Sequence, residues 1–377
     1  MQDKIIYLDN AATTVVKEEV LDAFNKAKKL YFANPSSIHI PGQEASRLLE
    51  KAREQILATL KVKDDELIFT SGATEANNLA IKGYCLRYQN RGKHIIVSNI
   101  EHPSVLETAK QLEEHFGFSV TYLPVNKNGV VEVETLKQGM RKDTILVSIM
   151  AVNNEIGSIN PIHEIANLLK EYPLVAFHVD VTQGIGKFDL PYQDMDMFSF
   201  SGHKMHGLNS SGALVKRKKI ELLPIMSGGG QESGYRSGTN DVALAVSLAR
   251  ALRLENEKIS ENYRKIATIS EYLKKYLLSH NDLYEINSGD NPYIVNFSTL
   301  TKKASVVVEA LSARGIMVSS TSACHAKEEP ISYVVLALGK GDQKAHNTIR
   351  VSLSEETTLE DIKCLIKNLE EIIEGLK

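Results

Sequence analysis

The stretch FSFSGHK, at residues 198–204, indicates the fold most directly. Its apolar residues predict a buried strand, and the small polar residues that follow bring one lysine, Lys204, to the end of that strand. The run LVAFHV, at residues 174–179, has the same character and leads to Asp180. Two buried strands that each end at a charged side chain predict an α/β protein with its functional groups along one edge of a sheet.

Short apolar runs alternate with amphipathic segments through the first two-thirds of the chain. Further strands are predicted at 66–70, 94–98, 119–123 and 145–150, and helices at 105–116 and 162–170. Strands that alternate with helices predict a mainly parallel sheet with helices on both faces. Ligands of such sheets bind beyond the carboxyl ends of the strands, where most of the polar motifs of this chain fall.

The composition changes after Arg250, where we expect a second unit to follow. A long charged helix at 252–278 is predicted to form the bridge to this smaller α+β unit. Its other predicted elements are a strand at 293–297, a helix at 304–314, strands at 316–318 and 348–353, and a terminal helix. We therefore predict a large domain at 15–255 and a small domain formed by 1–14 and 256–377.

Size and charge are those of an ordinary soluble globular protein. The 377 residues suffice for a large core, and 43% hydrophobic with 24% charged residues is ordinary for a soluble protein. The net charge of -3 gives no reason to expect nucleic acid or a membrane as a partner, and the basic run at 216–219 is interpreted as a solvated turn. The N-terminus lacks the basic start and apolar core of a signal peptide, so a cytoplasmic location is expected.

The cysteines Cys85, Cys324 and Cys364 are too few and too scattered for a disulfide framework or a zinc site, so no metal is predicted. A free cysteine is usually a small core residue. Cys324 differs, because it lies in a polar segment in which His325 and Lys327 favour the nucleophilic thiolate. We expect it to be exposed on a mobile loop.

Lys204 and Asp180 together suit pyridoxal phosphate (PLP). A lysine forms a Schiff base with the aldehyde of PLP, while an aspartate pairs with its protonated ring nitrogen. Gln183 lies just beyond Asp180. In combination with Cys324, this pair of residues indicates an enzyme that moves sulfur.

The segment TSGATEANN, at 70–78, runs from a predicted strand through a turn of small residues into a helix. Free backbone N–H groups at a helix N-terminus attract anions, and Thr74 adds a hydroxyl, so phosphate is the expected ligand; a helix cap without a ligand is the alternative. His102 follows the next strand. It could stack on a flat cofactor and carry protons, although a single histidine is more often structural.

Three further segments could contact a ligand. Arg350 lies inside an apolar strand, where a planar guanidinium suits bidentate capture of a carboxylate or a structural salt bridge. The adjacent amides in NNEIG, at 153–157, suit polar contacts to a cofactor or substrate, or form only a turn. The glycine-dense segment at 227–239 could approach a ligand closely or simply connect elements.

Taken together, these motifs closely resemble the cysteine desulfurases, which belong to the class V aminotransferases with the fold-type I architecture. The match covers nearly the whole chain in the order of the family. The motifs that carry it are YLDNAATT at 7–14, NPSSIH at 34–39, the turn at 70–78, EHP at 101–103, NNEIG at 153–157, HVD at 178–180, SGHK at 201–204, RSGT at 236–239 and SAC at 322–324.

The resemblance implies conversion of L-cysteine to L-alanine with PLP, leaving a persulfide on the enzyme for a sulfur-acceptor protein. It implies that Lys204 holds PLP, that His102 stacks on its ring and that Cys324 attacks the substrate sulfur. The other implied contacts are Asp180 to the ring nitrogen, Gln183 to the phenolic oxygen, Ala73, Thr74, Ser201 and His203 to the phosphate, Thr239 to the phosphate from the partner subunit of a homodimer, Asn154 to cofactor and substrate, and Arg350 to the substrate carboxylate.

Two segments depart from the family pattern. After the lysine the family usually shows GPKGxG, whereas this chain has GLNSSG at 207–212, and the usual SHV is SYV at 332–334. These departures indicate a specialised paralogue. They leave open whether the acceptor belongs to iron–sulfur assembly, tRNA thiolation or thiamine synthesis. The long segment from Cys324 to Pro330 fits the iron–sulfur and nitrogen-fixation subgroup.

Other functions stay open at this point. The chain could be a selenocysteine lyase or another PLP-dependent lyase or transaminase, although Cys324 argues against a simple transaminase. A catalytically weak sulfur-relay protein that keeps the fold is a further alternative. The presence of Lys204, Asp180 and His102 argues against it.

Overall fold

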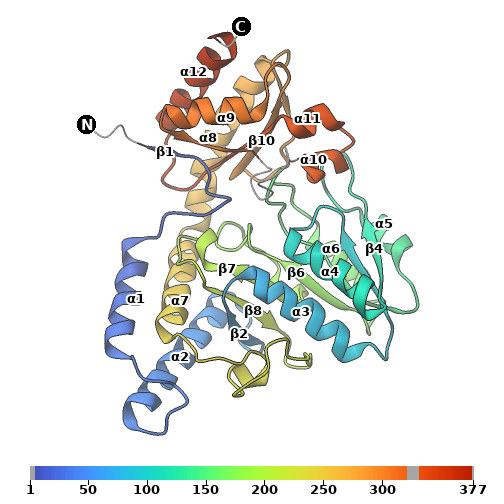
Figure 1. The fold of residues 1–377 in the computed structure, drawn as a ribbon, viewed down its shortest axis with the longest axis vertical. Coiled ribbons are helices and arrows are strands. Elements are labelled where there is room, and N and C mark those ends of the chain that lie inside the picture. Colours follow the sequence, from blue (N-terminus) through green and yellow to red (C-terminus); the bar gives the residue numbers. More distant parts are fainter. Residues whose placement is uncertain (1–4, 321–330, 376–377) are drawn as a thin grey trace.

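The structure of the chain is a computed structural model that describes residues 5–320 and 331–375 (Figure 1). Cys324 lies outside the described residues, and the expectations for it stay predictions. The larger unit is a sheet with helices on both faces, and a smaller unit lies at one end of it (Figure 1). Among the described residues, no helix is both long enough and apolar enough to cross a membrane.

The larger unit is built on a seven-stranded sheet in the order β2-β8-β7-β6-β5-β3-β4. Its strands are β2 (Glu66–Thr70), β3 (His94–Ser98), β4 (Ser119–Leu123), β5 (Thr144–Ser148), β6 (Ala176–Asp180), β7 (Met197–Ser201) and β8 (Gly212–Lys216). Neighbouring strands are parallel except where β8 pairs with β2 and β7. The predicted mainly parallel sheet is confirmed.

Helices cover both faces of this sheet, and a buried apolar cluster fills each interface. The helices of this unit are α1 (Glu18–Leu30), α2 (Ile40–Thr59), α3 (Ala73–Tyr88), α4 (Pro103–Phe116), α5 (Val133–Gly139), α6 (Ile162–Leu169) and α7 (Val242–Glu257). Along β7, Phe198 and Phe200 belong to one cluster, whereas Met197 belongs to the other. This alternation explains why a strand buried on both faces is a nearly continuous apolar run in the sequence.

The smaller unit contains a four-stranded antiparallel sheet in the order β12-β13-β10-β9. Its elements are α8 (Ile259–Ser279), β9 (Tyr284–Ile286), β10 (Ile294–Thr299), α9 (Ala304–Ala313), β12 (Ser319–Ser320), α10 (Tyr333–Ala337), α11 (Asp342–His346), β13 (Thr348–Ser352) and α12 (Leu359–Gly375). A separate apolar core joins this sheet to α8, α9 and α12.

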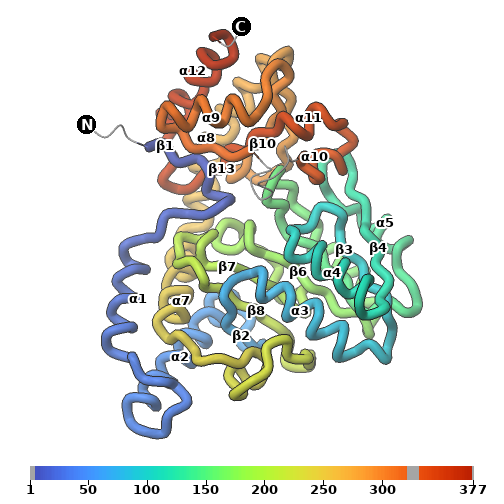
Figure 2. The backbone as a smooth tube through the Cα atoms, in the orientation of Figure 1, coloured from blue at the N-terminus to red at the C-terminus, as the bar shows by residue number. Residues whose placement is uncertain are grey.

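The N-terminal segment lies with the smaller unit. Its strand β1 (Ile6–Tyr7) pairs in parallel with β11 (Ile316–Met317), and Asp9 forms a bridge with Ser352. Figure 2 shows the chain passing from β1 beside the smaller unit to α1 on the larger one. The division of the chain into a domain at 15–255 and a second at 1–14 with 256–377 stays a prediction.

The connection between the units differs from the single helix predicted at 252–278. Helix α7 ends at Glu257 and α8 begins at Ile259, because Lys258 between them has φ -120° and ψ 9°. Since neither glycine nor proline marks this position, the apolar periodicity continues across it and hides the break.

The basic run at 216–219 differs in part from the prediction of a solvated turn. Lys218 and Lys219 are exposed in a turn after β8, as predicted, whereas Lys216 is not. Lys216 is the last residue of β8 and is only 1% exposed. Its amine pairs with Glu66, donates to the Ile220 carbonyl at 2.7 Å and lies 4.6 Å from the centre of the Tyr235 ring. These partners offset the cost of burying the charge.

Candidate active site

The carboxyl ends of β6 and β7 lie side by side, because the two strands are parallel neighbours. Strand β6 ends at Asp180, and a 3-10 helix (Gly202–Lys204) follows β7 and ends at the lysine. Lys204 Nζ donates hydrogen bonds of 2.6 Å to the carbonyl oxygens of Ala11 and Ala12. The sheet thus places an amine and a carboxylate at the same edge.

The environment of Lys204 favours its neutral form. Burial lowers the pKa of its amine to about 7, and the positive charges of Arg350 and Lys187 act in the same direction. The carboxylates of Asp9 and Asp180 act in the opposite direction. Because an ordinary lysine has a pKa of about 10.4, Lys204 has a far larger neutral, nucleophilic fraction near pH 7.

The buried Asp180 carboxylate is held by two N–H donors. Its Oδ1 accepts from the Thr182 backbone at 2.9 Å, and its Oδ2 accepts from Asn77 Nδ2 at 2.8 Å. Asn77 lies on α3, is fully buried and also donates to Ser104 Oγ at 2.9 Å. These contacts fix the orientation of the carboxylate.

His102 immediately precedes α4 and is fixed through Ser104. Its Nδ1 accepts from the Ser104 N–H at 3.1 Å and lies 2.8 Å from Ser104 Oγ. Because Nδ1 acts as an acceptor, the proton of the neutral ring lies on Nε2. Burial lowers the pKa of His102, and although the Asp180 charge opposes this effect, the net direction is downward. The ring therefore tends to be neutral near pH 7.

The four residues predicted to hold a phosphate lie around the N-terminus of α3 and the end of β7. The Ala73 N–H donates to Ser201 Oγ at 2.7 Å, and Thr74 is exposed in the first turn of α3. His203 Nδ1 lies 3.2 Å from Thr13 Oγ1. Burial, assisted by the charge of Lys204, lowers the pKa of His203 to about 4. Hydroxyls, a neutral imidazole and a helix N-terminus suit an anion.

Arg350 reaches from the smaller unit to the larger one. Its Nη2 donates to Asp9 Oδ1 at 2.9 Å, and its Nη1 donates to the Asn154 carbonyl at 3.0 Å. Within the described residues, Arg350 Nε and Asn154 Oδ1 are buried without a hydrogen-bond partner. Unpaired buried polar atoms are rare, so two of them on neighbouring residues indicate a ligand-binding position.

Gln183 is connected to Lys204 through the N-terminal motif. Its Nε2 donates at 3.0 Å to the Ala11 carbonyl, which also accepts from Lys204. The Oε1 atom of Gln183 is buried and has no partner in the described part of the chain. The side chain therefore keeps hydrogen-bonding capacity for a ligand.

Two predicted residues are not joined to this arrangement by a described contact. Thr239 is exposed and lines a cavity of about 180 Å³ with Ser71 and Gly212. Its predicted contact involves a second subunit. Cys324 lies outside the described residues.

Three residues of the site were not singled out from the sequence. Asn77 binds Asp180, Asp9 binds Arg350, and buried Lys187 adds a positive charge that acts on Lys204. Asn77 and Asp9 belong to motifs quoted above, so a signal for them was present. Lys187 belongs to no motif, and its burial follows only from the tertiary fold.

A second charged cluster adjoins Lys204. Lys17 Nζ contacts Glu255 and lies 2.6 Å from Glu355 Oε1, while His206 Nε2 lies 3.1 Å from Glu355 Oε2. His206, Glu255 and Glu355 present ligand atoms within 4.8 Å of one another, a spacing that could suit a metal ion. The ammonium of Lys17 already contacts both carboxylates, so the protein itself supplies a positive charge there.

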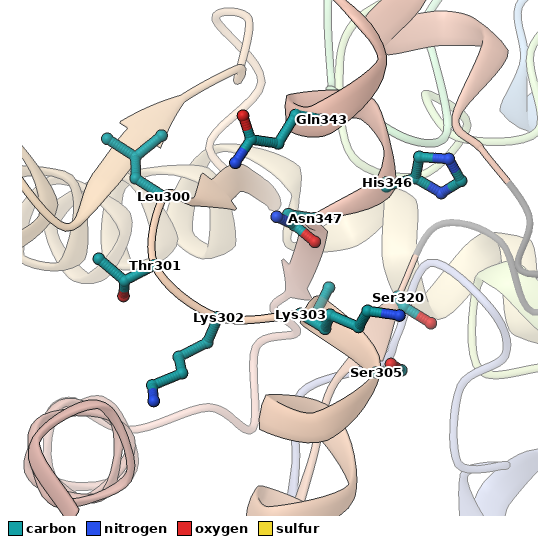
Figure 3. Close-up of a pocket in the computed structure, with 10 residues that line it drawn as sticks. Leu300, Thr301, Lys302, Lys303, Ser305, Ser320, Gln343, His346 and Asn347 are labelled. Carbon is teal, nitrogen blue, oxygen red and sulfur yellow. The ribbon is translucent and has the colours of Figure 1, made fainter. Parts of the chain in front are cut away.

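A separate cavity of about 390 Å³ lies in the smaller unit and contains none of the predicted site residues. Figure 3 shows Lys303 directed toward Ser320, whereas Lys302 extends away from it. Gln343 and Asn347 line the same cavity. The polar side chains that line this cavity do not converge on one point in Figure 3, so we do not assign the active site to the cavity.

The family sequence model Aminotransferase class-V matches residues 6–365, so the chain belongs to the class V aminotransferases, whose members are PLP enzymes. A cysteine desulfurase IscS from Dictyoglomus turgidum is 39% identical over 377 residues, which cover 99% of this chain and 95% of that protein. Within the family, the chain therefore groups with the cysteine desulfurases, as its motifs predicted.

Solved structures agree with this grouping. A NifS-like protein superposes with a TM-score of 0.91 at 36% identity, covering 99% of this chain and 100% of that one. A structure of SspA in complex with cysteine superposes with a TM-score of 0.81 at 35% identity, covering 94% of this chain and 100% of that one. The predicted fold-type I architecture is confirmed.

Proposed function

We propose that this chain is a cysteine desulfurase, which converts L-cysteine to L-alanine and retains the sulfur as a persulfide on Cys324. The observation that carries the proposal is the meeting of Lys204 and Asp180 at neighbouring strand ends, with Arg350 reaching in from the smaller unit. Membership of the family and the similarity to cysteine desulfurases support it.

The residues around Lys204 fit PLP on three points. The lowered pKa of Lys204 gives the amine the neutral form that bonds to an aldehyde. Asp180 offers a buried, oriented carboxylate to a ring nitrogen. Asn77, Asn154 and Gln183 each have a buried side-chain oxygen that finds no hydrogen-bond partner among the described residues, and all three are close to these groups in the fold. We therefore infer that PLP is held by Lys204, with its phosphate at the N-terminus of α3.

Bound PLP supplies an electron sink that activates the α-carbon and then the β-carbon of an amino-acid substrate. Among the residues of the chain, Asp180 would stabilise a proton on the ring nitrogen, and His102 would stack on the ring and exchange a proton through Nε2. Lys204 would carry the α-proton of the substrate, because a pKa of about 7 permits both protonation states of its amine near neutral pH.

We assign the substrate carboxylate to Arg350 and Asn154. The guanidinium is already held on one side by Asp9 and by the Asn154 carbonyl, so it is oriented before substrate arrives. A fixed, planar donor binds a carboxylate with less loss of side-chain entropy than a flexible one.

Cys324 completes the reaction. Its thiolate attacks the sulfur of the substrate, so an S–S bond forms while the Cβ–S bond of cysteine breaks. The electron pair of the broken bond stays with the substrate carbon, which gains a proton to become alanine. The persulfide is then reduced by an acceptor thiol, which takes the terminal sulfur.

We further propose a homodimer in which Thr239 contacts the phosphate of the partner subunit. Exposed apolar side chains gather at the connection between α1 and α2, where Phe32 is 79% exposed and Ile38 is 92% exposed. Contiguous exposed apolar residues usually mark an interface. The exposure of Thr239 is compatible with a contact to a second subunit.

We propose the class of the sulfur-acceptor protein, and not the individual protein. The similarity to IscS and NifS proteins favours an acceptor protein of iron–sulfur assembly, with a tRNA-thiolation enzyme or a thiamine-pathway carrier as the other candidates. Cytoplasmic location stays a prediction. Selenocysteine lyase remains the second function to test, because the same residues could bind selenocysteine.

The decisive experiment measures alanine and sulfide from L-cysteine with purified, PLP-loaded protein and dithiothreitol as sulfur acceptor. Equal amounts of both products support the proposal, and their absence contradicts it. Cys324→Ala should bind PLP and L-cysteine but release almost no sulfide. Lys204→Ala should lose the visible absorption of lysine-bound PLP, and borohydride trapping of PLP on another lysine would show the assignment to be wrong.

A further inference from the structure

The chain that follows residues 321–330 is hydrogen-bonded to the larger unit through Ser332 and Tyr333. Tyr333 Oη donates to the Glu101 carbonyl at 2.7 Å. Ser332 Oγ donates to Glu155 Oε2 at 2.5 Å and accepts from the Val335 N–H at 3.0 Å, so it also caps α10. Ser332 is 2% exposed. These contacts fix the chain at a defined place.

The acceptors of these hydrogen bonds adjoin two residues of the candidate active site. Glu101 directly precedes His102, and Glu155 directly follows Asn154. The two loops are also bound to each other, because Asn153 Nδ2 donates to the Ile100 carbonyl at 2.9 Å. Tyr333 and Ser332 are therefore bound to the same wall of the site that carries His102 and Asn154.

Apolar contacts reinforce this attachment. Val334, Val335 and Leu338 of the α10 segment form a small buried cluster with Ile100 and Ile156 from the two loops. This cluster is separate from the main cores of both units. It holds α10 at this position, while the hydroxyls of Ser332 and Tyr333 fix the N-terminal end of the helix.

The other end of the undescribed segment is also attached to a site residue. Strand β12 (Ser319–Ser320) pairs with β13, where Ser319 lies opposite Arg350. Cys324 follows Ser320 by four residues and precedes Ser332 by eight residues. The segment that carries Cys324 is therefore attached, on each side, beside residues of the candidate site.

We propose that Tyr333, supported by Ser332, is a positioning residue for sulfur transfer, because it fixes the chain after Cys324 against the loops that carry His102 and Asn154. This inference rests on the proposed function and adds to it a residue that acts through Cys324. Loss of the Tyr333 hydroxyl leaves the ring in place but releases one attachment. The thiol then meets the substrate sulfur in the correct geometry less often.

The test separates the events at the cofactor from the transfer of sulfur. PLP-loaded protein is mixed with L-cysteine in a single turnover, and two signals are followed: the visible absorption change of the cofactor and the persulfide on Cys324, trapped by alkylation and identified by mass. For Tyr333→Phe we expect persulfide to form about three- to tenfold more slowly, the effect of losing one hydrogen bond, with an unchanged absorption change. Tyr272→Phe, which removes a hydroxyl from an exposed residue of α8, should match the wild type in both signals.

Ser332→Ala is measured in parallel, so that the test does not depend on one variant; it should slow persulfide formation in the same selective way. Equal persulfide rates in Tyr333→Phe, Ser332→Ala and the wild type overturn the inference and leave the proposed function standing. The inference is also overturned if a variant loses bound cofactor and its absorption change to the same extent as it loses persulfide, since the role of the residue is then structural. If the wild type forms neither persulfide nor alanine, the proposed function fails, and the inference with it.

Discussion

Asp9 and Arg350 form an ion pair of 2.9 Å that joins the N-terminal segment to β13. The pair is largely buried, and a second N–H of the same guanidinium donates to the Asn154 carbonyl of the larger unit. Arg350 is thus oriented by both units at once, whereas a flexible surface arginine samples many positions. The ion pair pre-organises the residue that we assign to the substrate carboxylate.

Replacement of Arg350 by lysine should therefore impair substrate binding. A lysine keeps the charge but cannot donate from a planar fork to Asp9 and Asn154 together. We expect Arg350→Lys to lower kcat/KM for L-cysteine by about 10- to 100-fold, mainly through KM, as for loss of charged hydrogen bonds. Steady-state alanine formation measures it. Arg314→Lys, at an exposed pair on the smaller unit, is the matched control, and equal KM values in both variants would remove Arg350 from substrate binding.

The lowered pKa of Lys204 predicts a pH dependence for cofactor loading. The neutral amine is the reactive form, so the rate at which cofactor-free protein takes up PLP should rise with pH and level off above about pH 7. Because the positive charge of Lys187 helps to lower this pKa, Lys187→Met should move the midpoint to higher pH. Absorption stopped-flow across a pH series measures the rate, with exposed Lys219→Met as control. An unchanged midpoint in Lys187→Met would contradict the electrostatic role of Lys187.

The sheet and the strand ends could be predicted because strands buried on both faces are short apolar runs, and the first polar residue after each run lies at the sheet edge. Lys204 and Asp180 were located in this way. The contact from Asn77 to Asp180 could not be, since it joins residues 103 positions apart and depends on how α3 packs on the sheet. Only a motif placed Asn77 near the site.

Two predictions were wrong, for the burial of Lys216 and for a single helix across Lys258, and both have causes in the tertiary fold. Lys216 resembles its exposed neighbours in sequence, yet the pairing of β8 with β2 brings Glu66 beside it and allows it to be buried. The break at Lys258 follows from the packing of two helices on different units, which leaves no mark in the local sequence. Burial of a charge and a helix break without glycine are both decided by tertiary contacts.

The cluster of Lys17, His206, Glu255 and Glu355 predicts how stability depends on pH. Burial raises the pKa of Glu355, but the hydrogen bonds and charges of His206 and Lys17 outweigh it and hold this pKa well below its usual range. The pKa of His206 is raised, because Glu355 outweighs the effect of burial. The stabilisation of the fold by ionised Glu355 is therefore present above the unfolded-state pKa of Glu355, about 4.3. The stabilisation by charged His206 is lost as pH rises through the raised pKa of His206.

Glu355→Gln should accordingly destabilise the protein more at about pH 5.5 than at about pH 8.5, because only the lower pH keeps His206 charged. We expect a loss of roughly 2 kcal/mol at the lower pH, less than for a fully buried pair because Glu355 is partly exposed. Urea unfolding at both pH values measures it. The neighbouring exposed Glu356→Gln should have little effect, and equal losses at both pH values for Glu355→Gln would contradict the part assigned to His206.

The exposed apolar connection between α1 and α2 predicts a change of oligomeric state. If this surface forms the dimer interface, a glutamate in place of Phe32 is buried without a partner when two subunits associate. This makes association less favourable by several kcal/mol. We expect the wild type to sediment as a dimer and Phe32→Glu as a monomer that retains less PLP, since Thr239 of a second subunit then no longer reaches the phosphate. Leu174→Glu, at a residue that is 62% exposed on another part of the surface, should stay dimeric. A dimeric Phe32→Glu would place the interface elsewhere, whereas a monomeric wild type that retains PLP would show that Thr239 is not needed from a partner.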